Sequence, residues 1–162
     1  MTLDVEVRVP NTALFRGEGA AIARDELRSA MEWAVSDLRS AIVPATPVGV
    51  SGALRAATQT SLSGDLATLT GRVFNPLGYA APVEHGRRPG SFPPVAPLVL
   101  WVQRKLGVAA DDARSVAFLV ARKIAHRGIK AVRMFSAAHA SRAGAIRARF
   151  DRVAADLARR LG

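Results

Sequence analysis

The first residues of the chain alternate in polarity, because Val5, Val7 and Val9 are separated by charged side chains. Alternation with a period of two places successive side chains on opposite faces of a β-strand. We therefore predict an extended N-terminal arm over residues 1–13.

The period changes in the next segment, where apolar positions recur every three or four residues from about residue 17 to residue 42. This spacing is typical of an amphipathic α-helix with one face in the core. Pro44 and Pro47 follow, and because proline disfavours a helical backbone before it, we expect the helix to end there. The apolar stripe consists of Leu27, Met31, Val35, Leu38 and Ile42.

Two short strands are predicted after this helix, around residues 58–62 and 67–73. In the second strand Leu69, Gly71 and Val73 share one face, as the strand period requires. A Ser-Gly-Asp turn separates the two strands, which predicts an antiparallel hairpin.

Three more helices are predicted over residues 95–106, from about 111 to 128, and over 134–161. Gly107 and Gly128 follow the first two, and glycine is a common residue just beyond a helix end. The positions expected to be buried are Leu98, Trp101, Val102 and Leu106, then Val116, Leu119, Val120 and Ile124, then Ile146, Phe150, Val153, Leu157 and Leu161.

These elements predict an α+β fold, in which a small antiparallel sheet packs with a long N-terminal helix and C-terminal helices. The chain has 162 residues, of which 49% are hydrophobic, so we expect a single domain over residues 1–162. Much of the apolar fraction is alanine, which predicts a thin core. There is no cysteine and no apolar run near the roughly 18 residues that cross a bilayer, so we expect a reducing, cytoplasmic setting.

Positive charge is concentrated in the second half of the chain. Residues 1–80 contain 7 Lys and Arg against 8 Asp and Glu, whereas residues 81–162 contain 16 against 5. This asymmetry favours contact with DNA, RNA or an acidic partner. Arginines that only solubilise the helix faces would produce the same asymmetry, so both interpretations stay open.

No group of residues in the sequence indicates catalysis or metal binding. The histidines, His85, His126 and His139, have neither HxH nor HxxxH spacing, and no cysteine is present to complete a zinc site. GxSxG and Walker-type glycine motifs are also missing from the sequence. We therefore expect a protein that is not an enzyme and uses no cofactor, and an enzyme with an unrecognised site is the weakest alternative.

Four motifs follow one another in a distinctive order: TPVGVSGALRAAT, YAAPVEHGRRPG, PPVAPLVLWVQRKLG and AFLVARKIAHRGI. In this order, over about residues 15–140, they resemble the neck and tail-completion proteins of long-tailed bacteriophages, also described as minor tail or head–tail connector proteins. The first motif departs from the family pattern at Ser51, where threonine is usual.

The resemblance implies a structural virion protein in the neck of a phage or phage-derived particle. Such proteins are assembled in the host cytoplasm, form homo-oligomeric rings where tail meets head, and complete the tail for joining. A hexamer is expected, although the sequence leaves six and twelve copies open. Other neck and tail proteins are the implied partners, with nonspecific contact to passing genomic DNA and none to a membrane. The alternative is a sequence-nonspecific nucleic-acid-binding protein.

The motifs also suggest which residues form the assembly interface. Prolines restrict the backbone of residues 79–94, so this segment is expected to be a semi-rigid loop that orders against a neighbour with little entropic loss. Glu84 is expected to be structural rather than catalytic. The predicted interface residues are Pro47, Gly52, Leu54, Arg55, Tyr79, Val83, Glu84, Gly86, Arg87, Arg88, Pro89, Phe92 and Pro94, and those predicted to face DNA or a channel are Arg87, Arg88, Arg147, Arg149 and Arg152.

Overall fold

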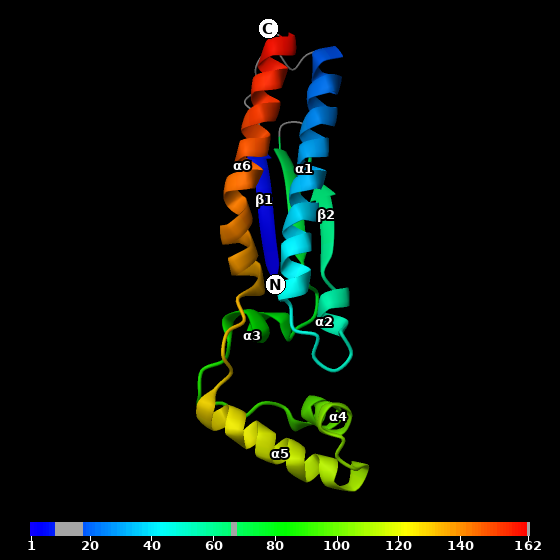
Figure 1. Cartoon of the computed structure of the whole chain (residues 1–162), viewed down its shortest axis with the longest axis vertical. Helices are drawn as coiled ribbons and strands as arrows, with labels where there is room; N and C mark the ends of the chain where they lie inside the picture. The colour runs from blue at the N-terminus through cyan, green and yellow to red at the C-terminus, as the bar shows by residue number, and fades with distance from the viewer. Residues whose placement is uncertain (9–17, 66–67, 162) are drawn as a thin grey trace. The chain divides into compact units, whose positions relative to one another are not determined.

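The computed structural model describes residues 1–8, 18–65 and 68–161 of the chain. It confirms the predicted α+β class, with a small antiparallel sheet, a long helix after the first strand and further helices toward the C-terminus (Figure 1). The elements are β1 (Thr2–Arg8), α1 (Glu18–Ala45), α2 (Ala53–Ala56), β2 (Gln59–Ser63), β3 (Thr68–Phe74), α3 (Ala80–His85), α4 (Val95–Leu106), α5 (Ala110–Arg127) and α6 (Met134–Leu161).

The chain divides into two compact units, each assembled from separate stretches of sequence. The sheet unit comprises Met1–Ala45, Ala57–Pro76 and Met134–Gly162. The hairpin unit comprises Thr46–Ala56 and Leu77–Arg133. The single domain expected from the length stays a prediction, and each unit is described by itself below.

The sheet unit contains a three-stranded antiparallel sheet in the order β1-β3-β2. Val5 and Leu62 both lie opposite Gly71, so the central strand carries one partner on each side. Thr2–Arg8 is an edge strand of the sheet, which confirms the extended conformation predicted there, and residues 9–13 of the predicted arm lie outside the described residues.

Helix α1 packs on one face of this sheet through the predicted stripe, all five members of which are buried. A Cβ atom at Gly71 would lie 2.5 Å from Sδ of Met31 and 2.6 Å from Cγ1 of Val35. A side chain at this position would require Met31 and Val35 to move, so glycine lets α1 approach β3 closely. The buried residues of the stripe are Leu27, Met31, Val35, Leu38 and Ile42.

Helix α6 runs beside α1 and completes the core of the sheet unit (Figure 1). Ile146, Val153 and Leu157 are buried and Phe150 is half-buried, which confirms these members of its predicted stripe. The side chain of Leu161 lies outside the described residues.

Ion pairs connect the elements of the sheet unit on its surface. Arg142 of α6 lies 3.7 Å from Asp37 of α1, and Arg160 of α6 lies 3.0 Å from Glu26 of α1. Across the sheet, Nε of Arg72 donates to Asp4 at 2.8 Å, and this hydrogen bond raises the pKa of Arg72 above its ordinary value.

The hairpin unit is built around α4 and α5, which pack against each other along a stripe of alanines. Ala113, Ala117 and Ala121 are buried at intervals of four residues, so they share one face of α5. The prediction that Leu119 is buried is wrong: it is 57% exposed, because the alanines occupy the contact face and place it on another side of the helix. Leu106 is also exposed, at 52%, since it is the last residue of α4 before the Gly107 cap.

The predicted loop over residues 79–94 is partly wrong, because Ala80–His85 forms the short helix α3. Pro82 lies in the first turn of α3, where its missing N–H costs no helical hydrogen bond. A six-residue helix leaves too little periodicity to be recognised among prolines and glycines.

Backbone pairing joins the segment after α3 to the segment after α5, and this contact is called the junction below. Arg87 and Ile129 exchange both backbone hydrogen bonds, at 2.9 and 2.8 Å, and the N–H of Gly90 donates to the carbonyl of Ala125 at 2.8 Å. Gly128 has φ of 72°, and a Cβ atom there would lie 2.1 Å from the carbonyl oxygen of Arg87. Glycine is therefore required at this position on both conformational and steric grounds.

Candidate assembly interface

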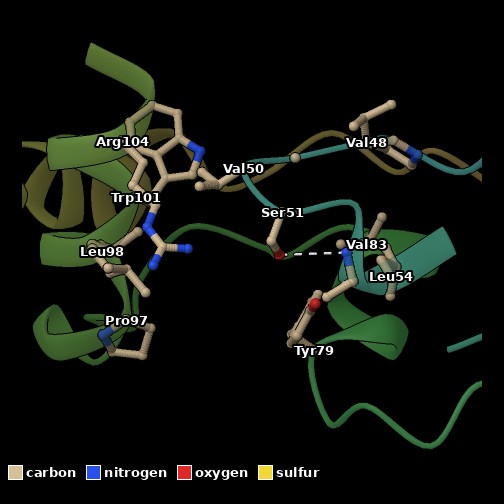
Figure 2. A pocket seen from close by; sticks show the side chains of 14 residues that line it. Val48, Val50, Ser51, Leu54, Tyr79, Val83, Pro97, Leu98, Trp101 and Arg104 are labelled. Carbon is tan, nitrogen blue, oxygen red and sulfur yellow. Dashed lines mark hydrogen bonds between the residues drawn. The ribbon is translucent and has the colours of Figure 1, made fainter. Parts of the chain in front are cut away.

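An apolar groove of about 400 Å³ lies on the hairpin unit, lined by residues 47–54, by α3 with the residue before it, and by α4 (Figure 2). These three segments are far apart in the sequence and converge only in the folded unit. Each comes from a different one of the first three motifs that carry the family resemblance.

The first wall of the groove is a tight turn that leads into α2. The N–H of Gly52 donates to the carbonyl of Val48 at 2.9 Å, and Nε of Arg55 donates to the carbonyl of the buried Thr46. These bonds fold the segment back on itself. As a result Leu54 is buried, while Val48 stays 52% exposed at the rim of the groove.

The second wall comes from Tyr79 and Val83, which lie four residues apart and so share one side of α3. The N–H of Val83 donates to the carbonyl of Tyr79 at 3.2 Å, which fixes this spacing. Ala80 and Glu84 are buried. Tyr79, at 49% exposed, therefore presents its ring to the groove and to solvent.

Helix α4 forms the third wall with Pro97, Leu98, Leu100, Trp101 and Arg104. Figure 2 shows that the labelled side chains of α4 lie on one side of the groove, across from the turn. Leu100 is 50% exposed, and Leu98 and Trp101 are half-buried. Among the described residues that line the groove, only Arg104 is charged.

The structure separates the predicted interface residues into groups. Pro47, Leu54, Tyr79 and Val83 line the groove, and Gly52 and Arg55 build its first wall. The others lie elsewhere in the hairpin unit: Glu84 buried in α3, Gly86 as the cap of α3, Arg87 in the junction, Arg88 and Pro89 exposed after it, Phe92 in tilted contact with Phe118 with ring centroids 5.3 Å apart, and Pro94 before α4.

The α4 side of the groove is absent from the interface predicted from the sequence. Helical spacing assigns Leu98 and Trp101 to the core, and it gives no role to Leu100 or Arg104. The width of the apolar surface of α4 could have identified them. This surface is wider than the face that α4 needs in order to pack against α5 with its buried alanines.

The arginines predicted to face DNA are divided between the two units. Arg87 and Arg88 belong to the hairpin unit, whereas Arg147, Arg149 and Arg152 lie on α6 of the sheet unit. Arg147 lines a shallow pocket there together with three carboxylates, those of Asp4, Glu6 and Asp151.

Among the described residues, no group of three or more histidines, cysteines or carboxylates is arranged to hold a metal ion. In the same part of the chain, no helix has the length and apolar character to cross a membrane. Comparison with known proteins gave no match to a family model, a curated protein or a solved structure.

Proposed function

We propose that this chain is a structural virion protein of a phage or phage-derived particle neck, forming a ring at the head–tail junction and completing the tail for joining. In this proposal it is not an enzyme. Its partners are further copies of itself, with a hexamer expected, and other neck and tail proteins.

The observation that supports this proposal best is the convergence of motif segments on one exposed apolar groove. A monomeric protein gains nothing from leaving Val48, Tyr79 and Leu100 about half exposed around a shared depression. Apolar and aromatic side chains at the centre of a patch, with charge at the edge, are typical of protein–protein contacts.

We infer that the occupant of the groove is a neighbouring copy of the chain. A head-to-tail contact between a groove on one copy and a different surface on the next generates a closed ring when the rotation between copies closes. The semi-rigid walls favour this role, because a turn held by internal hydrogen bonds loses little entropy on binding.

Size-exclusion chromatography with light scattering, over a wide range of protein concentration, tests the proposal. Leu100→Arg places a charge in the groove, and Leu119→Arg places the same charge at a similarly exposed leucine outside it. We expect the unaltered chain and Leu119→Arg to form the same oligomer and Leu100→Arg to stay monomeric. A chain that is monomeric at every concentration, or two variants that behave alike, would contradict the proposal.

A nucleic-acid-binding protein without sequence preference is the second candidate function. The observation that favours it is the excess of positive charge on the hairpin unit, which also supports a more specific inference.

A further inference from the structure

Positive charge is distributed unequally between the two units. The hairpin unit contains 11 Lys and Arg against 3 Asp and Glu, whereas the sheet unit contains 12 against 10. One of the three acids of the hairpin unit, Glu84, is buried, and the other two, Asp111 and Asp112, lie in the first turn of α5. The C-terminal end of α5 therefore carries cations without nearby carboxylates in the sequence.

Six of these cations lie around the end of α5 and the junction. The pairing of Arg87 with Ile129 holds Arg87 and Arg88 next to the residues that follow α5. The end of α5 supplies Arg122, Lys123 and Arg127, and Lys130 directly follows Ile129 of the junction. We call this set the basic cluster: Arg87, Arg88, Arg122, Lys123, Arg127 and Lys130.

The basic cluster has no internal acidic counterpart in the part of the chain that the structure describes. No member of the cluster takes part in an ion pair there, whereas α6 of the sheet unit pairs Arg142, Arg159 and Arg160 with carboxylates. The guanidinium of Arg87 donates to the hydroxyl of Ser91 at 2.7 Å, which positions it and leaves its charge uncompensated. The other five members are exposed.

Stabilisation of the helix dipole accounts for only a small part of this arrangement. Cations interact favourably with the last turn of a helix, and Arg127 lies there. Arg122 and Lys123 precede that turn, and Arg87, Arg88 and Lys130 lie outside the helix. Gathering so many like charges without a partner is unfavourable unless an anion compensates them.

The chemistry of the cluster fits phosphate groups better than an acidic protein. Protein interfaces are depleted of lysine, whereas the cluster includes Lys123 and Lys130, both exposed. The segments that carry the cluster, residues 86–91 and 119–130, contain no Asn or Gln, the side chains that pair with adenine edges. We propose that the basic cluster binds the phosphate backbone of duplex DNA without reading its sequence.

This inference does not rest on ring assembly, because a single copy carries the whole cluster. It also changes which arginines are expected to meet DNA. On α6, Arg142, Arg159 and Arg160 have carboxylate partners, and the predicted DNA-facing Arg147 lines a pocket with three carboxylates, so α6 offers less uncompensated charge to phosphates. Arg87 and Arg88 keep their predicted role, now together with α5.

Fluorescence anisotropy with a short labelled duplex and the full chain tests the inference. The triple variant Arg122→Gln/Lys123→Gln/Arg127→Gln removes three charges from the cluster. The matched control Arg152→Gln/Arg159→Gln/Arg160→Gln removes three charges from α6. For the cluster variant we expect affinity to fall at least about tenfold, and the slope of log K against log salt to become shallower by roughly 2.7, at about 0.9 per lost phosphate contact.

The control triple should change the affinity less than about threefold, because Arg159 and Arg160 are already paired with Asp156 and Glu26. Equal losses in both triples would mean that only net charge matters, and that result overturns the inference, as does an unaltered chain that does not bind. Should the cluster triple melt early, Arg88→Gln/Lys130→Gln removes two charges outside any helix and should weaken binding in the same direction.

Two further measurements separate the possible ligands. Duplexes of unrelated sequence should bind with equal affinity, and a strong preference would contradict backbone recognition. Polyglutamate at the same charge concentration should displace the duplex far less well than unlabelled duplex does, and equal displacement would assign the cluster to an acidic protein instead. Leu100→Arg should bind DNA normally, so loss of assembly and loss of DNA binding are distinguishable.

Discussion

The sheet unit and the hairpin unit differ in the ion pairing of their charged side chains and in the exposure of their large apolar side chains. In the sheet unit, the long helices α1 and α6 neutralise each other through pairs such as Glu26–Arg160, and the core stripe of α1 is fully covered. In the hairpin unit, the cations of the basic cluster have no carboxylate partner among the described residues.

The exposed apolar residues follow the same division. Of the large hydrophobic residues found exposed in the described chain, only Trp33 belongs to the sheet unit. In the proposed function, the sheet unit is the scaffold and the hairpin unit carries the exposed groups that would meet partners. The exposed residues of the hairpin unit are Val48, Tyr79, Phe92, Leu100, Leu106, Phe118, Leu119, Ile129 and Val132.

The largest effect is expected from a cavity in the scaffold. Leu38 is fully buried in the sheet unit, so Leu38→Ala should lower the free energy of unfolding by about 2–5 kcal/mol. Leu119→Ala, at an exposed leucine of the hairpin unit, should change it by less than about 0.5 kcal/mol. Urea denaturation of both variants measures the contrast, and comparable losses would mean that the two units do not differ as described.

The junction of the hairpin unit gives the next largest effect. Gly128→Ala forces a positive φ on alanine and places its Cβ against the carbonyl of Arg87, so we expect a loss of about 1–3 kcal/mol. Gly144 is the matched control, because it lies in α6 and a Cβ atom there would meet no other atom within 4 Å. Gly144→Ala should stabilise the protein by about 0.5–1 kcal/mol. Thermal melting that shifts both variants in the same direction would contradict this account.

If the groove is the assembly interface, a substitution in it should reduce self-association more than it reduces the stability of the fold. Trp101 is half-buried, so Trp101→Ala should cost less than the roughly 3–5 kcal/mol of a fully buried ring while it abolishes self-association. Trp33→Ala in the sheet unit should leave self-association intact. Calorimetry combined with light scattering measures both quantities. A Trp101→Ala protein that assembles like the unaltered chain would remove the groove from the interface.

The smallest effect concerns the surface ion pairs of the scaffold. A double-mutant cycle with Glu26→Gln and Arg160→Gln should give a coupling of about 0.2–1 kcal/mol that weakens with salt, because both side chains are about half exposed. A coupling well above this range would show that the pair holds α1 and α6 together, rather than mainly neutralising their charge.

Local periodicity is enough to predict much of the scaffold. The stripe of α1 repeats every three or four residues with few interruptions, so its buried residues can be read directly from the sequence. The core positions of α5 are partly mispredicted. The prediction assigns the larger apolar residues, such as Leu119, to the contact face, whereas the buried residues there are alanines. Helix α3 escapes prediction since six residues carry little periodic signal.

The candidate site is less predictable because it is a tertiary feature. The motifs identify Tyr79 and Val83, but their meeting with Leu100 and Trp101 depends on how α4 packs in the hairpin unit. The sequence predicts an excess of positive charge in the second half of the chain, but not which cations form the basic cluster. Its location follows only from the junction, which holds Arg87 beside the end of α5, and from the ion pairs that occupy part of α6.

Hydrogen–deuterium exchange of the assembled and the diluted, monomeric chain tests most directly whether the hairpin unit is the part that meets partners. The account predicts that assembly slows exchange in residues 47–54, 79–83 and 97–104, while the amides of α1 exchange equally in both states. Protection confined to α1 and α6, with the groove segments unchanged, would contradict it.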